Sequence, residues 1–176
     1  FRAGFRQLAP RGLSFEAWQY HHQLPEVTAL ARAFPDTTII LNHFSGPLGI
    51  GPYAGQRETL FAQWRRDLAE LASCPNVVAK LGGLVMPING FGFHYAALPP
   101  TSDEILAATE PFYREALACF GAERCMFESN FPVDKASVSY PVLWNAFKKL
   151  VADGSRAERA ALFHDTAVRC YRLGVP

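Results

Sequence analysis

The stretch RCMFESNFPVDK, residues 124–135, leads from an apolar run directly into the polar side chains Glu128, Asn130 and Asp134. Pro132 prevents a helix from starting immediately after the apolar run. In β/α proteins, ligands bind at the carboxyl ends of parallel strands, where loops vary freely while the sheet holds their anchor points. The stretch therefore predicts a buried parallel strand with a candidate site at its end.

Three further segments resemble this strand: LSFEAWQYHHQ at 13–23, TTIILNHF at 37–44 and NVVAKLGGL at 76–84. Helical patterns alternate with them, and three of the four strands are almost continuously apolar, as expected when helices cover both faces. This alternation predicts βα units around a parallel sheet. Either a doubly wound sheet or half of a (β/α)8 barrel fits.

Apolar stripes and capping residues in the sequence predict the helices. Helices are expected over 25–34, about 60–71, 102–120 and near the carboxyl end. Thr101 with Glu104, and Ser155 with Glu158, have the spacing of a capping box, in which each partner satisfies a free amide of the first turn. These signals predict two helix starts.

Composition excludes several classes of protein. A chain of 176 residues with 49% hydrophobic residues can form one domain with a sizeable core. Seventeen basic and sixteen acidic residues give a net charge of +1 without long runs of one sign, so we expect no nucleic-acid or membrane partner. The four cysteines lack C-x-x-C spacing and indicate reduced thiols in a cytoplasmic protein. Because the chain opens at Phe1 rather than Met, we expect residues 1–176 to be one N-terminally truncated domain.

Histidines near the strand ends are the first candidates for chemistry. His21 and His43 each follow a strand, and imidazole can bind a divalent metal or transfer protons near neutral pH. A hydrogen-bonded core histidine is the alternative for each. His94 lies in a glycine-rich loop and is a candidate substrate contact or a solvated loop residue.

The remaining candidates lie on the third and fourth strands. Lys80 forms an ion pair with Glu128 or binds an anionic substrate. Asp134 is a candidate base, a helix cap or a solvated loop residue. No nucleophile elbow or phosphate-binding glycine motif is present, which argues against a serine hydrolase and a nucleotide-binding protein.

In this order, FEAWQYHHQLPE, TTIILNHFSGP, PNVVAKLGGL and RCMFESNFPVDK closely resemble the amidohydrolase-2 family, the TIM-barrel hydrolases and decarboxylases related to 2-pyrone-4,6-dicarboxylate lactonase. The resemblance covers nearly the whole chain. It implies an α/β fold, a (β/α)8 TIM barrel of which this chain supplies roughly strands five to eight with their helices. Four such units leave two open strand edges, so the isolated chain is expected to aggregate or form a homo-oligomer and to be inactive.

The resemblance also implies roles for individual residues. His21 matches the fifth-strand metal ligand, and His43 matches the sixth-strand histidine that activates water or polarises the substrate. The eighth-strand motif usually reads like G-S-D-W-P, whereas here ESNFP places Asn130 at the aspartate position. An amide is a poor ligand for a hard metal and cannot act as a base. A zinc or manganese site is therefore expected to be weak or absent, with His21 and Glu128 as its candidate ligands.

The expected function is hydrolysis of a small, anionic lactone, ester or amide. His43 assists attack on the carbonyl, Asp134 is the second-choice base, and Lys80, Asn130 and His94 contact the substrate. The alternatives are a noncatalytic small-molecule-binding protein with a decayed site and a decarboxylase of the same family.

Overall fold

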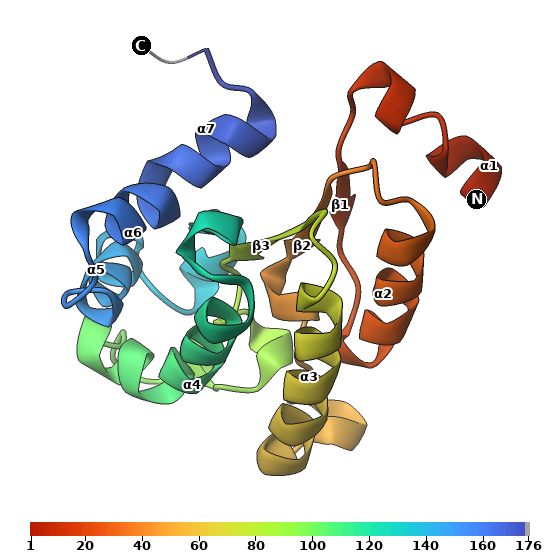
Figure 1. Cartoon of the computed structure of the whole chain (residues 1–176). Helices are drawn as coiled ribbons and strands as arrows, with labels where there is room; N and C mark the ends of the chain where they lie inside the picture. Colours follow the sequence, from red (N-terminus) through yellow and green to blue (C-terminus); the bar gives the residue numbers. More distant parts are fainter. Residues whose placement is uncertain (175–176) are drawn as a thin grey trace.

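The computed structural model describes residues 1–174, which fold around a four-stranded parallel sheet (Figure 1). The strands are β1 Phe15–Ala17, β2 Ile39–Asn42, β3 Val77–Leu81 and β4 Cys125–Phe127. They are hydrogen-bonded in the order β1-β2-β3-β4, which is also their order in the sequence. The reversal of strand order that marks a doubly wound sheet is absent from this part of the chain.

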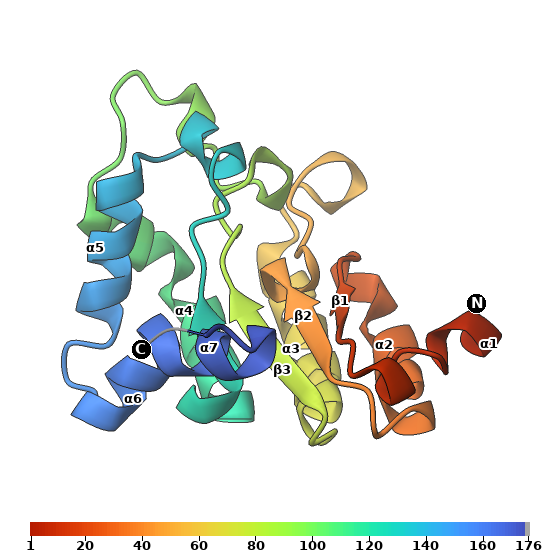
Figure 2. The same cartoon turned by 90° about the horizontal axis from the view of Figure 1, so that it is seen from above.

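The helices are α1 Arg2–Phe5, α2 Leu24–Ala33, α3 Arg57–Ala72, α4 Ser102–Phe120, α5 Tyr140–Leu150, α6 Arg156–Ala160 and α7 Thr166–Tyr171, with a π-helical turn at Ala161–Asp165. Helices α2 to α5 pack each against the next. Figure 2 shows α2, α3 and α4 behind the sheet and α7 across its front.

The two faces of the sheet carry different cores, because successive residues of a strand point to opposite sides. Ile39, Leu41, Val77 and Ala79 belong to the main core, against the helices. On the opposite face, called the inner face below, Ile40, Val78 and Met126 form a small cluster that Ala167 and Cys170 cover. Helix α7 therefore shields a surface that is apolar at its centre.

The predictions of sheet type, helices and helix caps are confirmed by this fold. The parallel sheet is present, and the expected helices 25–34, 60–71 and 102–120 correspond to α2, α3 and α4. Both capping boxes form. All four cysteines are free. Within residues 1–174, no helix combines the length and apolar character needed to cross a bilayer.

The extent of the first strand was predicted wrongly. The segment 13–23 forms strand only over Phe15–Ala17, and His21 begins a 3₁₀ turn, His21–Gln23. Tyr20 is the residue before this turn, and its backbone amide is bound by the side chain of Gln23 at 3.2 Å. This local bond favours a turn over continued strand, so strand alternation does not set the direction of His21.

Candidate active site

Polar side chains meet where the strands end on the inner face. Lys80 Nζ lies 2.6 Å from Glu16 Oε2 and 3.6 Å from Glu128 Oε2. His43 Nδ1 lies 2.6 Å from Glu128 Oε1. Strands β1 and β3 and the residues directly after β2 and β4 therefore supply one connected row, Glu16–Lys80–Glu128–His43. The side chains of His43 and Lys80 retain 16% of their exposure, and Glu128 retains 20%, so a small molecule can reach them.

The backbone after β2 directs His43 into this row. The φ angles of His43, Phe44 and Ser45 are 51°, 55° and 61°, in the left-handed region that residues other than glycine rarely adopt. Two contacts from distant elements hold this turn. Trp64 Nε1 donates to the Phe44 carbonyl at 2.7 Å, and Gln19 Nε2 donates to Ser45 Oγ at 2.6 Å.

Two glycines after β3 make room for the acid and the imidazole. A Cβ added at Gly82 would lie 2.0 Å from Glu128 Cγ. A Cβ added at Gly83 would lie 2.5 Å from His43 Nδ1 and 3.1 Å from Asn130 Nδ2, and Gly83 has a φ of +71°. The paired glycines of this segment are therefore required by close contacts with the candidate site.

Asn130 contacts a second carboxyl group rather than standing alone. Its Nδ2 donates to Asp134 Oδ1 at 2.8 Å. Asp134 is fully buried, and its other oxygen has no hydrogen-bond partner among residues 1–174. An aspartate at position 130 could not donate this bond when ionised, and it would place two carboxylates against each other. The amide therefore suits the position because it satisfies Asp134.

Burial determines the proton affinity of Asp134. It raises the pKa of this carboxyl from 3.8 to about 7, although the hydrogen bond from Asn130 and the proximity of His43 act in the opposite direction. Two of the alternatives for Asp134 were wrong: it is neither a solvated loop residue nor a helix cap, since Pro132 precedes the short turn Val133–Ala136. The role of base stays a prediction.

The acid at the other end of the row behaves differently. Burial favours a higher pKa for Glu16, but hydrogen bonds from Lys80 and Tyr171 outweigh it, and the pKa lies below its usual value. Tyr171, on α7, donates its hydroxyl proton to Glu16 Oε1. Glu16 therefore remains ionised and holds Lys80 in place.

Glu16 and Tyr171 were missed in the sequence. Period-two alternation in Phe15–Ala17 signals that Glu16 faces away from its two apolar neighbours, and this signal was available. The position of Tyr171 had no comparable signal, because it depends on how α7 crosses the sheet. The predicted pair Lys80–Glu128 is present at 3.6 Å, but Glu16 is the nearer partner of Lys80.

Each of the two candidate metal ligands has another partner. His21 Nδ1 accepts a hydrogen bond from the Leu48 amide at 3.3 Å, and its ring contacts Tyr53. Burial lowers the pKa of His21, and neighbouring His22 adds to this effect. Glu128 is engaged by the row described above. Within residues 1–174, no three His, Cys, Asp or Glu side chains converge as a metal site requires. These residues alone do not fit a zinc or manganese ion, and a metal stays a prediction.

His94 lies apart from the row in every contact that the structure shows. Its ring packs on Tyr95, with 3.8 Å between ring centroids, and it lines a separate cavity with Phe131 and Tyr140. Its predicted contact with substrate stays a prediction.

The sequence matches the model of the amidohydrolase family, Amidohydro_2, over residues 1–173. It is 44% identical to the uncharacterized protein y4mH of Sinorhizobium fredii, covering 98% of this chain and 52% of that protein. It is 32% identical to an L-fucono-1,5-lactonase of Burkholderia multivorans, covering 100% of this chain and 57% of that enzyme. The chain thus spans about half the length of the curated relatives it matches.

Solved structures agree with this assignment. A Burkholderia multivorans amidohydrolase superposes with a TM-score of 0.83 at 30% identity, over 97% of this chain and 56% of that one, and crystals of it contain bound HEPES or zinc. A putative 2-pyrone-4,6-dicarboxylic acid hydrolase from Pseudomonas putida shares the fold, with a TM-score of 0.64 at 24% identity over 97% of this chain and 56% of that one. The match to the family model over residues 1–173 shows that the chain belongs to the amidohydrolase family.

Proposed function

We propose that this chain carries the water-activating residues of a lactone hydrolase. One observation supports the proposal above all: His43 Nδ1 lies 2.6 Å from Glu128 Oε1. The negative charge of Glu128 this close to Nδ1 favours a proton on that nitrogen and leaves Nε2 as the candidate base, the electrostatic role that the acid has toward the histidine of a Ser-His-Asp triad. The relatives named L-fucono-1,5-lactonase support lactones as the substrate class.

The reaction needs few steps. His43 Nε2 takes a proton from water, and the oxygen of that water adds to the lactone carbonyl. The bond between the carbonyl carbon and the ring oxygen then breaks, and the imidazolium returns its proton to the departing alkoxide. Glu128 stabilises the imidazolium between these transfers. The product is a hydroxy acid, and no step here passes through a metal.

The charges of the row favour a neutral substrate over the anionic one expected from the sequence. Lys80 is the one lysine in the row, and Glu16 and Glu128 both lie within 4 Å of it. An anionic substrate would meet a cation that already has two partners. A neutral, hydroxyl-bearing lactone avoids this repulsion, and its acid product is repelled after ring opening.

We further propose that the four strands occupy the place of strands five to eight of a (β/α)8 barrel. The sequential strand order supports this arrangement, as does a coverage of 56% in the barrel-forming relative.

Lactone hydrolysis can be tested with a pH-indicator assay on L-fucono-1,5-lactone and related neutral aldonolactones. We expect turnover by a protein in which this chain is joined to the remaining four strands of the barrel, and a loss of at least about 100-fold in kcat for His43→Ala, the usual scale for removing a general base. His164→Ala is the matched control, because His164 is 60% exposed and its Nδ1 pairs with its neighbour Asp165, outside the row. Equal kcat values for the two variants would contradict the proposed role of His43 as the base.

A noncatalytic binding protein is the second candidate, and Asn130 at the family's aspartate position is the observation that favours it. Asn130→Asp separates the two. Activity and metal binding that appear only in the variant indicate a decayed site. Loss of an existing activity in the variant indicates that the amide serves the chemistry, by holding Asp134 at 2.8 Å.

A further inference from the structure

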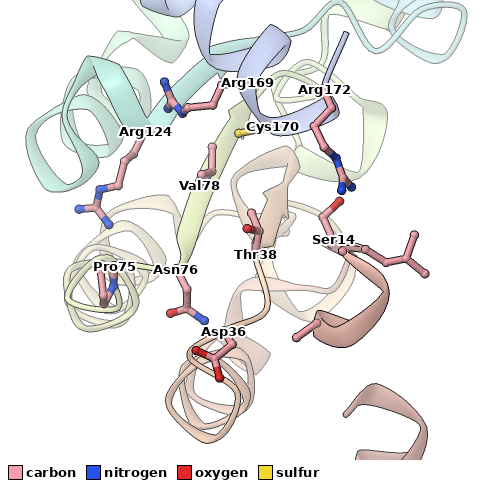
Figure 3. A pocket seen from close by; sticks show the side chains of 13 residues that line it. Ser14, Asp36, Thr38, Pro75, Asn76, Val78, Arg124, Arg169, Cys170 and Arg172 are labelled. Atoms are coloured by element: carbon pink, nitrogen blue, oxygen red, sulfur yellow. The ribbon is translucent and has the colours of Figure 1, made fainter. Parts of the chain in front are cut away.

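A cavity of about 410 Å³ opens at the amino-terminal edge of the sheet, opposite the strand ends that carry the candidate active site. The residue immediately before each strand contributes to its lining: Ser14 before β1, Thr38 before β2, Asn76 before β3 and Arg124 before β4. Helix α7 closes the remaining side with Arg169 and Cys170. Figure 3 shows Arg124 and Arg172 on opposite sides, with Val78 and Cys170 between them.

The lining of this cavity is positively charged. Arg124, Arg169 and Arg172 line it, against a single acidic residue, Asp36. None of the three arginines forms an ion pair within residues 1–174. Arg124 donates to the backbone carbonyls of Ala72 at 3.1 Å and Cys74 at 3.2 Å, and Arg169 donates to that of Glu123. Bonds to neutral carbonyls fix these guanidinium groups without neutralising their charge.

The guanidinium of Arg172 makes no hydrogen bond or ion pair with residues 1–174. Arg172 has a left-handed φ of 54° directly after α7. A Cβ added at Gly12 would lie 3.1 Å from Arg172 Nη1, so the guanidinium spans from α7 to the segment before β1. In Figure 3 it points toward Ser14. The hydroxyl groups of Ser14 and Thr38 make no hydrogen bond to another side chain or carbonyl among the described residues.

We propose that this cavity binds the phosphate group of a small molecule. Guanidinium groups on opposite walls supply charge, and the Arg172 fork with two free hydroxyl groups supplies donors for several oxygens of one dianion. The volume exceeds that of phosphate alone and lies within the range of small-molecule sites. The site is separate from the proposed catalytic row and does not depend on it.

Binding here also affects α7. Tyr171, directly before Arg172, donates to Glu16, which holds Lys80 at 2.6 Å. A phosphate group that draws Arg172 toward the strand starts fixes α7 on the inner face. Occupancy of the cavity therefore stabilises the helix end that supports the acid end of the row.

The test is calorimetric titration of the protein with inorganic phosphate and with glucose 6-phosphate, against sodium chloride at equal ionic strength. We expect saturable binding of the sugar phosphate, and at least about tenfold weaker binding to Arg172→Gln, since one charge-assisted contact is worth roughly a factor of ten. Arg156→Gln is the control, because Arg156 is exposed on α6 and does not line the cavity. The control should bind like the wild-type protein.

Amide chemical shifts locate the site even if a variant fails to fold. On titration of the wild-type protein, the amides of Gly12, Ser14 and Thr38 should shift together with one dissociation constant, while that of Asn130 stays unchanged. Saturable binding of inorganic phosphate with the same affinity would identify the free ion, rather than an organic phosphate, as the ligand. Binding that sodium chloride reproduces, equal affinities of the two glutamine variants, or shifts only near Asn130 would overturn the proposal.

Discussion

Asp134→Asn should stabilise the protein at neutral and alkaline pH although it removes a buried hydrogen-bonded group. The carboxyl is completely buried, and burial raises its pKa from 3.8 to about 7. The folded state therefore holds its proton more tightly than the unfolded state does. The contribution of this group to stability is largest below pH 3.8, falls as pH rises from 3.8 to about 7, and stays constant above that range.

The magnitude follows from the size of the shift. A change of about three pKa units corresponds to about 4 kcal/mol, since each unit is worth 1.36 kcal/mol. The asparagine cannot ionise, so its unfolding free energy lacks this pH dependence. The variant should match the wild-type protein near pH 4 and exceed it by up to about 4 kcal/mol near pH 8.

Urea unfolding followed by circular dichroism between pH 4 and 8.5 measures this difference. Asp153→Asn is the control, because it removes the same charge from an exposed position. The quantity of interest is the variant's stability minus that of the wild-type protein, in which the titrations of other groups cancel. A difference that does not change with pH, or a variant less stable than wild type at pH 8, would refute the reasoning.

Three further substitutions test the site and the fold. Gly83→Ala should lower the free energy of unfolding by about 1 kcal/mol because of its left-handed φ of +71°, and by more because the added Cβ approaches the imidazole of His43; lactone hydrolysis should be lost. The control is Gly55→Ala, which has a φ of +72° but open space around it, and thermal unfolding should show only the loss of about 1 kcal/mol. Lys80→Met should lower the free energy of unfolding at pH 7 by about 2 kcal/mol, because it leaves two carboxylates without their cation. In a double-mutant cycle, adding Glu16→Gln should restore part of this loss, whereas fully additive effects of the two substitutions would show that the two side chains do not interact. Thr101→Ala should lower the free energy of unfolding by about 1 kcal/mol through loss of the helix cap, and an unchanged denaturation midpoint would contradict the observed capping bond.

Local patterns predicted the fold well because their causes are local. The capping boxes depend on residues three apart, and the stripe of α3 depends on residues within two turns. The sheet followed because apolar strands alternate with these helices. A pattern of this kind carries no information on which strand ends meet, so the sequence left a doubly wound sheet open until the strand order was known.

The candidate site was only partly predictable because its contacts join distant segments. Glu16 and Lys80 are 64 positions apart, and their pairing depends on the register of three strands. The sequence showed that His43 follows a strand. It did not reveal the left-handed turn that orients the imidazole, because none of the three residues of that turn is a glycine. The resemblance showed Asn130 as a departure, and its hydrogen bond to Asp134 supplied the physical reason.

The orientation of the His43 imidazole, the proposed base, depends partly on the left-handed backbone of the turn His43–Ser45. Three consecutive residues in this region cost roughly 3–6 kcal/mol if each costs 1–2 kcal/mol, and the turn persists because Trp64 and Gln19 bind it from outside. A substitution at Trp64, which is not a member of the row Glu16–Lys80–Glu128–His43, can therefore relax the turn and move the imidazole away. Substitutions that disturb the packing of α3 around Trp64 should therefore also lower the rate of the proposed reaction.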